Sequence, residues 1–329
     1  MGPALSLLRD GNGRVHLMYY KEIPYPIVRE GQHCPVDLYV KIRNDYRLFA
    51  AKGALITREH CRIFSRGNTT FYICSSDSES AEEFLKSLLT DLVTDPHLEP
   101  EAKADIIYSS SMRSIRQVFQ GLNHKTLREI EKTSEFVVKL ILSDKRVMNE
   151  LVKVKSHAHF TYQHSVKVGI FGTCLAVHLF GEGNGDHNLQ ALSTALFLHD
   201  IGMTRVPRKI LEKREPLSDM EHQIVMKHTV WGHDRLMNAN YLTSQAASVV
   251  LFHHERCNGK GYPFGKTRED IPLYARICAI ADTFETLTSS VSSSSPMTPF
   301  EALTVMQRDM AGAFDNRLFR AFVEMLGSC

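Results

Sequence analysis

The chain has 329 residues, of which 43% are hydrophobic and 23% charged, and 39 lysines and arginines nearly balance 37 aspartates and glutamates. This length predicts two domains, and the composition is that of a globular protein with a substantial core. The small net charge, and the lack of an apolar run of about 20 residues, argue against a nucleic-acid polymer or a membrane as partner. Seven scattered cysteines without a Cys-x-x-Cys pair, and no signal-peptide pattern at Met1, favour a reduced, cytoplasmic protein.

The first 78 residues predict a small α+β domain. Alternating runs rich in branched and aromatic residues predict strands at 36–42, 46–50 and 70–74, and Thr57 can open a short helix before the last strand. This part has no phosphate-binding glycine loop and no cluster of catalytic residue types. It is therefore interpreted as a regulatory or partner-binding domain, with a signalling protein or a second copy of the chain (a homodimer) as candidate partners.

Beyond a serine-rich break, residues 79–150 predict a helical linker. Apolar residues recur with helical spacing in two segments, 101–120 and 125–143, and Gly121 closes the first of them. Helices that join and pack two domains are the simplest interpretation of this segment.

An all-α domain is predicted for residues 151–329. Helices are expected at 160–180 and 187–201, and a final helix that Asp315 caps. Two capping boxes mark further helix starts, in which Ser218 precedes Glu221 and Thr298 precedes Glu301. The fold class is thus a two-domain α+β protein, with a small N-terminal α+β domain followed by a helical bundle.

Three apolar runs of the C-terminal half end in side chains that do not belong in a core. Residues 195–198 lead into His199-Asp200, residues 248–252 into His253-His254, and residues 277–281 into Asp282. Burying an imidazole or a carboxylate without a partner costs on the order of several kcal/mol of folding free energy. Such groups are therefore normally paired with another side chain or bound to a metal. Eleven of the 16 histidines fall within residues 157–254, which places any histidine chemistry in this half.

Seven residues along this half are candidate ligands, five imidazoles and two carboxylates: His164, His199, Asp200, His228, His253, His254 and Asp282. They exceed the needs of one tetrahedral zinc site and suit two adjacent divalent ions bridged by a carboxylate. Imidazole and carboxylate ligands suit iron, manganese or zinc, and their spacing does not choose between these metals. Two such ions can bind a phosphodiester oxygen and generate a hydroxide for in-line attack, so this ligand set predicts phosphate-ester hydrolysis.

Several of these residues stand in a larger ordered pattern. His199-Asp200-Ile201-Gly202 is followed by His228, by His253-His254-Glu255, by residues 259–263 (Gly-Lys-Gly-Tyr-Pro) and by Ala281-Asp282. This set, with His164-Ser165-x-Lys167-Val168 before it, resembles the HD-GYP family over about residues 156–290. That family consists of bacterial phosphodiesterases that hydrolyse cyclic di-GMP at a bi- or trinuclear metal centre, commonly of iron or manganese. The resemblance therefore implies two divalent ions, with iron or manganese preferred and zinc as the alternative.

The resemblance implies roles for individual residues. Asp200 is implied to be the bridging carboxylate and, with Tyr262, a candidate catalytic residue, and the other six ligands complete the two coordination shells. Tyr262 is expected near the dinucleotide or in support of the metal pocket. Lys266 and Arg276, with Arg268 as a further candidate, are expected to contact substrate phosphates, and Glu255 is expected to orient an imidazole or to act as a ligand.

Three positions depart from the family's pattern. Met203 stands where the family has a lysine that stabilises charge in the transition state, which predicts a slower or altered reaction. Residues 289–295 are almost all serine and lack the family's positive charge. Phe160 replaces the glutamate of three-metal members, which predicts a binuclear centre.

These departures keep a second function open, that of a catalytically weakened member acting as a metal-containing cyclic-dinucleotide receptor or protein-docking module. Hydrolysis of another phosphoester, such as a linear dinucleotide, is a third. For the site itself, His199 and Asp200 could instead form a buried structural pair. His222 and the surface pair His233-Asp234 are the rivals of His228.

Overall fold

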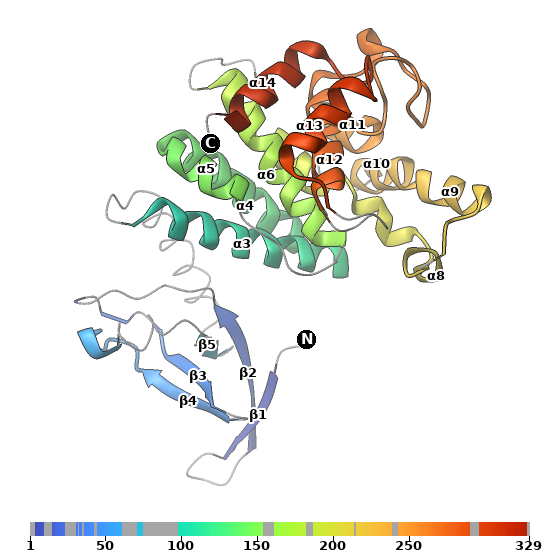
Figure 1. The fold of residues 1–329 in the computed structure, drawn as a ribbon. Coiled ribbons are helices and arrows are strands. Elements are labelled where there is room, and N and C mark those ends of the chain that lie inside the picture. Colours follow the sequence, from blue (N-terminus) through green and yellow to red (C-terminus); the bar gives the residue numbers. More distant parts are fainter. Residues whose placement is uncertain are drawn as a thin grey trace. The chain divides into compact units, whose positions relative to one another are not determined.

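A computed structural model of the chain describes residues 4–9, 15–23, 31, 33–34, 36–42, 45–60, 71–74, 98–153, 161–181, 187–213, 215–238, 243–289 and 296–327. The chain divides into two compact units, Met1–Leu98 and Glu99–Cys329. The first contains all the described strands, and the second is helical (Figure 1).

The N-terminal unit is built on one antiparallel sheet with the strand order β1-β2-β5-β3-β4. Its strands are β1 (Ala4–Arg9), β2 (Val15–Ile23), β3 (Leu38–Ile42), β4 (Asp45–Ala50) and β5 (Phe71–Cys74). The hairpin of β3 and β4 pairs Ile42 with Asp45 at its turn and Leu38 with Ala50 at its open end. Leu38, Ile56 and Ile73 are buried and supply much of the apolar core that a small sheet needs.

The three predicted strands are present as β3, β4 and β5, and residues 58–60 form a helical turn after Thr57. Two further strands were not predicted, β1 and β2, which pair with each other and, through β2, with β5.

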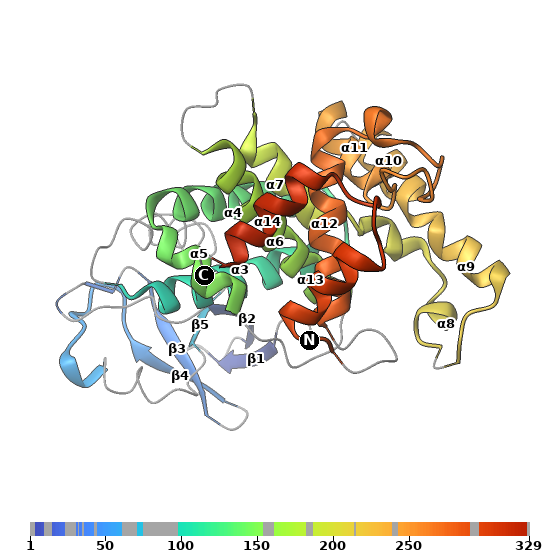
Figure 2. The same ribbon diagram turned by 45° about the horizontal axis from the view of Figure 1, so that its top comes forward.

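The C-terminal unit is helical in its described residues and contains no described strand (Figures 1 and 2). Its first half contains α3 (Pro100–Gln120), α4 (His124–Ser143), α5 (Lys145–Lys153), α6 (Thr161–Phe180), α7 (Leu189–Leu198), the 3₁₀ helix η2 (Ile201–Arg205), α8 (Arg208–Leu211) and α9 (Asp219–Met226). Its second half contains α10 (His228–Asn238), α11 (Ser244–Phe252), η3 (Arg268–Asp270), α12 (Leu273–Thr288), α13 (Pro299–Arg308) and α14 (Asn316–Gly327).

Helices α6, α7 and α12 form the middle of this unit, while α8 and α9 lie at one edge (Figure 2). Every residue of α7 from Leu192 to Leu198 is buried, and α12 is buried from Ile277 through Glu285. Each fully buried leucine or isoleucine contributes roughly 1.5–3 kcal/mol. The helices that carry the candidate ligands are therefore held by the apolar core itself.

Helices α3 and α4 pack on α6, and α4 also packs on α7. Residues 99–150, interpreted from the sequence as part of a linker, thus lie within the helical unit, and the division of the chain falls at residues 98 and 99. The functional roles assigned to the two domains stay predictions.

Helix starts follow the side-chain signals in the sequence. Ser218 and Thr298 each accept a hydrogen bond from the backbone N–H of the glutamate three residues later, which completes both predicted capping boxes. Asp315 accepts hydrogen bonds from the N–H groups of Arg317 and Leu318 and so caps α14, also as predicted. Within the described part of the chain, no helix has the length and apolar character needed to cross a membrane.

Candidate metal centre

Most of the candidate ligands lie where a helix of the C-terminal unit ends. His199 and Asp200 directly follow α7, His253 and His254 directly follow α11, and His228 opens α10 just after α9. The last turn of a helix carries partial negative charge on its free carbonyl groups, which favours a cation nearby. The remaining two ligands come from within helices, His164 from the first turn of α6 and Asp282 from the buried face of α12.

Three of the imidazoles lie within hydrogen-bonding distance of a backbone carbonyl group in the preceding helical turn. The Nδ1 atom of His199 lies 2.9 Å from the carbonyl oxygen of Leu196, that of His228 2.7 Å from Val225, and that of His253 3.0 Å from Val250. A carbonyl oxygen only accepts, so each Nδ1 carries the proton and donates it. In the neutral form of each ring, Nε2 is therefore the unprotonated acceptor, which is the form in which histidine binds a metal.

One group of ligand atoms gathers around His164. Its Nε2 atom lies 3.2 Å from Nε2 of His199 and 3.2 Å from Oδ1 of Asp282. Oδ2 of Asp200 lies 3.7 Å from Nε2 of both imidazoles. His164, His199 and Asp200 can each direct one ligand atom at a common point.

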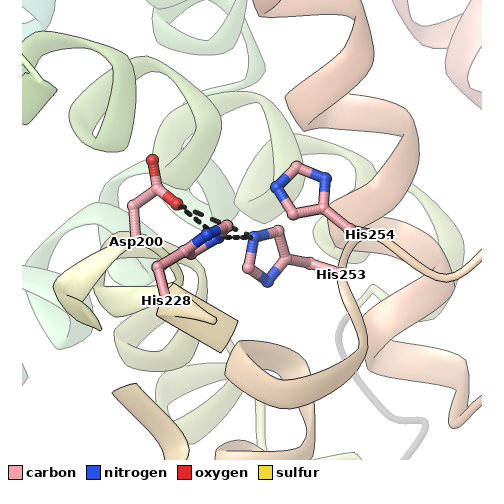
Figure 3. A group of neighbouring side chains, drawn as sticks. All are labelled: Asp200, His228, His253 and His254. Atoms are coloured by element: carbon pink, nitrogen blue, oxygen red, sulfur yellow. Dashed lines mark hydrogen bonds and ion pairs between the residues drawn. The ribbon is translucent and has the colours of Figure 1, made fainter. Parts of the chain in front are cut away.

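A second group contains Asp200, His228, His253 and His254. The Nε2 atoms of His228 and His253 are 3.2 Å apart, and Oδ1 of Asp200 lies 3.2 Å from the first and 3.7 Å from the second. Figure 3 shows these three side chains turned toward one another, with the ring of His254 beside them. Asp200 thus faces one group with each of its two oxygens.

Asp282 spans the two groups as well, because its Oδ1 faces His164 while its Oδ2 lies 3.6 Å from Nδ1 of His254. The structure therefore brings all seven predicted ligands together. The Nε2 atoms of two pairs of rings, His164 with His199 and His228 with His253, lie 3.2 Å apart. When both nitrogens of a pair lack a proton their lone pairs converge, and a cation can then bind between them. This donor set fits divalent ions, and its nitrogen and oxygen atoms suit iron, manganese or zinc.

The titration behaviour of the cluster agrees with a site for cations. Burial alone would raise the pKa of the Asp200 and Asp282 carboxyls, but the surrounding imidazoles hold both well below their usual range. Burial lowers the pKa of His199 to about 4 and also lowers the pKa of His254, so both rings are neutral near pH 7. Burial opposes the charged form of His164 and His228 too, but hydrogen bonds to Asp282 and Glu285 raise the pKa of His164, and one to Asp200 raises that of His228. In the metal-free protein these two rings therefore favour a proton, which a bound metal ion would displace.

The segment after His254 folds back over that ring. Tyr262 stacks on the His254 imidazole with ring centroids 4.6 Å apart, and its N–H donates to the carbonyl of His254. Gly261 permits this approach, because a Cβ atom there would lie 2.3 Å from the backbone nitrogen of Arg256 and 2.5 Å from the carbonyl oxygen of His254. Tyr262 was expected near the dinucleotide or in support of the metal pocket. The structure shows its contact with His254, a candidate metal ligand, which corresponds to the second of these roles.

Glu255 fastens the same loop. Its buried carboxylate accepts hydrogen bonds from the N–H groups of Phe264 at 2.8 Å and Lys266 at 2.9 Å. The sequence-based expectation that Glu255 orients an imidazole is therefore wrong: both carboxylate oxygens hold loop backbone instead.

Replacing Glu255 with alanine should lower the free energy of unfolding by about 2–4 kcal/mol, because two N–H groups lose a charged acceptor. The loop should loosen and the Tyr262 ring should leave His254, which tyrosine fluorescence and thermal melting would detect. The control is Glu269→Ala, whose side chain is 76% exposed and whose loss should change stability by no more than about 0.5 kcal/mol. Equal melting temperatures for the two variants would contradict this role for Glu255.

The residues predicted to contact substrate phosphates are engaged elsewhere. Nη1 of Arg276 lies 2.5 Å from Oδ2 of the buried Asp315, which also accepts a hydrogen bond from Arg268 at 2.9 Å. The ammonium of Lys266 lies over the ring of Phe252, 5.6 Å from its centroid. These contacts tie α12 and η3 to the start of α14, and phosphate binding by these side chains stays a prediction.

The positions that depart from the family pattern are only partly described. Met203 is half-buried in η2, and Ser289 follows the end of α12. Phe160 and residues 290–295 lie outside the described residues. The alternative pair His233-Asp234 has Nδ1 and Oδ1 3.4 Å apart with Asp234 55% exposed, as expected for a surface pair.

One residue of the cluster was missed from the sequence. Glu285 is buried on α12, and its Oε2 lies 2.5 Å from Nδ1 of His164. A carboxylate three residues after Asp282 on the same helix face was the available signal, but its partner is distant in sequence.

Comparison with known proteins gives three findings. A family profile described as HD domain matches residues 150–318. The chain is 31% identical over 234 residues to "Cyclic di-GMP phosphodiesterase PA4108" of Pseudomonas aeruginosa, covering 70% of this chain and 56% of that protein. It is 30% identical over 183 residues to "3'3'-cGAMP-specific phosphodiesterase 2" of Vibrio cholerae, covering 55% of this chain and 34% of that protein. The chain thus spans between about a third and just over half of the length of these curated relatives.

Among solved structures, the chain is similar to Bd1817, described as "a HDG"Y"P protein from Bdellovibrio bacteriovorus". The TM-score is 0.67 at 20% identity, and the match covers 94% of this chain and 99% of that one. This likeness shows a shared fold.

Proposed function

Because this chain belongs to the HD-domain family, in its HD-GYP branch, we propose that it is a metal-dependent phosphodiesterase that hydrolyses a cyclic dinucleotide. Cyclic di-GMP is the first candidate substrate, since relatives are named for it, and cyclic GMP-AMP is the second. The observation that carries the proposal is the convergence of six ligand side chains into two groups that share Asp200, with Asp282 close to a histidine of each group.

The proposed centre holds two divalent ions, iron or manganese by preference and zinc as the alternative. His164 and His199 would hold one, and His228, His253 and His254 the other, with Asp200 between them. Bound ions would supply Lewis acidity toward the phosphate and lower the pKa of water. The helix ends and the apolar core keep the imidazoles in position, which spares the reaction the cost of ordering them.

Tyr262 is the proposed substrate-side residue of this chain, because its ring stacks on His254 and its side chain is only half-buried. Lys266 and Arg276 would reach a dinucleotide phosphate only if they left Phe252 and Asp315, respectively. The N-terminal unit is proposed to bind a signalling partner or a second copy of the chain.

The test is turnover by the purified full chain after loading with Fe²⁺ or Mn²⁺. Cyclic di-GMP, cyclic GMP-AMP, cyclic di-AMP and a linear dinucleotide should be compared at equal concentration, with metal content measured on the same sample. Conversion of a cyclic dinucleotide to its linear form supports the proposal. A protein that binds two ions and turns over none of these compounds would contradict the enzymatic function.

The second candidate function is a metal-containing cyclic-dinucleotide receptor or docking module, and the position of Met203 favours it. In a 3₁₀ helix, residues three apart lie above one another. Asp200 precedes η2, and its carbonyl accepts the N–H of Met203 at 2.9 Å. An uncharged residue is therefore bonded through its backbone to the shared ligand, at the position where the family has a lysine. Binding of cyclic di-GMP without turnover is the result that would establish this function instead.

Replacing Met203 with lysine should raise kcat by at least about tenfold, since one group that stabilises developing charge is worth about 100-fold or more in other enzymes. The expected change is in kcat rather than KM, because the charge acts in the transition state. Met220→Lys is the matched control, since Met220 is 76% exposed on α9. An unchanged kcat for Met203→Lys at saturating metal would show that this position does not limit the reaction.

A further inference from the structure

Glu285 is a buried carboxylate that the proposed ligand set does not use. Its side chain is 2% exposed, and its Oε2 lies 2.5 Å from Nδ1 of His164, a residue 121 positions earlier in the chain. A carboxylate accepts, so the imidazole donates its Nδ1 proton to Glu285. The opposite nitrogen, Nε2, is thereby turned to Asp282 and His199.

The position of His164 in its helix explains why it needs this partner. His199, His228 and His253 each donate to a carbonyl group three residues earlier, near the end of a helix. Carbonyls are free there because the last four of a helix have no partner within it. His164 lies in the first turn of α6, where the carbonyl groups already accept hydrogen bonds from the following turn. A side chain from another helix must therefore fix its ring.

We propose that Glu285 is the positioning residue of the His164–His199 metal position, and that the two ions are consequently held unequally. The inference rests on the proposed binuclear centre. The second position, formed by His228, His253 and His254, has its first two rings fixed by helix carbonyls and does not depend on Glu285.

Two effects of Glu285 act on His164. The hydrogen bond holds the ring in one orientation, and the negative charge makes Nε2 a stronger donor to a metal ion. Loss of such a partner typically weakens metal binding about 10- to 100-fold. The effect should fall on one ion, because the Glu285 carboxylate contacts His164, which belongs to that position alone.

The variants Glu285→Ala and Glu285→Gln separate the two effects. Alanine removes both the acceptor and the charge, so the first position should bind Mn²⁺ about 10- to 100-fold more weakly while the second is unchanged. Glutamine keeps a carbonyl oxygen that can accept the Nδ1 proton but carries no charge, so it should restore part of the lost affinity. The measurement is a Mn²⁺ titration of the metal-free full chain, with ion stoichiometry determined by mass spectrometry.

A double substitution distinguishes positioning from a general packing role. If Glu285 acts through His164, then Glu285→Ala added to His164→Ala should cause no further loss of Mn²⁺ affinity. A packing role would instead make the two losses add. Circular dichroism of each metal-free variant checks folding, and Glu285→Gln carries the test if the alanine variant does not fold.

The inference is overturned if Glu285→Ala binds both ions with wild-type affinity, or if it weakens both positions equally. A wild-type chain that binds no Mn²⁺ or Fe²⁺ would instead overturn the proposed metal centre itself. The two failures are therefore distinguishable in one set of titrations.

Discussion

Asp200→Ala should remove both metal ions and lower kcat/KM for cyclic di-GMP by at least about a thousandfold, or about 4 kcal/mol of transition-state stabilisation. The reason is that its two oxygens face different ligand groups, one toward His164 and His199 and the other toward His228 and His253. Its removal also leaves imidazole lone pairs facing each other without a negative charge between them. Metal content and turnover of the purified full chain measure both effects.

The chain offers a matched control in its other His-Asp dipeptide. Asp234 is 55% exposed and follows His233 just as Asp200 follows His199. Asp234→Ala should leave metal content and kcat/KM within about twofold of the wild-type values, since exposed ion pairs contribute little. If Asp200→Ala retained both ions, or if the two variants lost activity alike, the shared-ligand arrangement would be wrong.

Gly202→Ala should destabilise the fold by about 3 kcal/mol or more and displace His228 from the centre. A Cβ atom at Gly202 would lie 1.9 Å from the carbonyl oxygen of His228 and 2.7 Å from the backbone nitrogen of Gly232. Both neighbours are backbone atoms of α10, so no rotamer change can relieve the clash and η2 must move away from α10. Overpacking of a dense core costs roughly 1–3 kcal/mol and occasionally more.

Thermal melting of the metal-free protein measures the loss of stability. A metal titration measures the loss of metal affinity that follows when His228 is displaced from the centre. Gly327→Ala is the control, because nothing lies within 4 Å of a Cβ atom at that position. It ends α14, where alanine should stabilise slightly, by no more than about 1 kcal/mol. A Gly202→Ala protein that melts like the wild type would mean that η2 does not press on α10 as the structure shows.

The assembly of the ligands could be predicted because several of them directly follow an apolar helix in the sequence. An apolar helix that is followed by His199-Asp200 or His253-His254 places these polar side chains at the edge of the core. When the apolar helices pack together, their ends and the polar side chains there come close to one another. A capping box such as that of Ser218 joins residues only three positions apart, so it too could be predicted from the sequence.

What could not be predicted depends on contacts between distant residues. Strand β2 pairs with β5 across about 50 residues, and no local signal fixes that pairing. The pairing of β1 with β2 did have a signal, because Asp10-Gly11-Asn12-Gly13 between them is a sequence typical of a hairpin turn, but this signal was not used in predicting the strands. Glu285 looks like any helical glutamate until α6 brings His164 to it. Glu255 lies beside the imidazole pair in sequence, yet its carboxylate is taken by backbone N–H groups of the following loop.

The carbonyl contacts of His199 and His253 also bear on how the centre comes apart. Each ring closes the last turn of its own helix, so fraying of α7 or α11 by a single turn would release a ligand and leave the rest of the bundle folded. Such partial openings require less free energy than global unfolding. Amide hydrogen exchange at the ends of these two helices would therefore report directly on how often the centre is dismantled in the native protein.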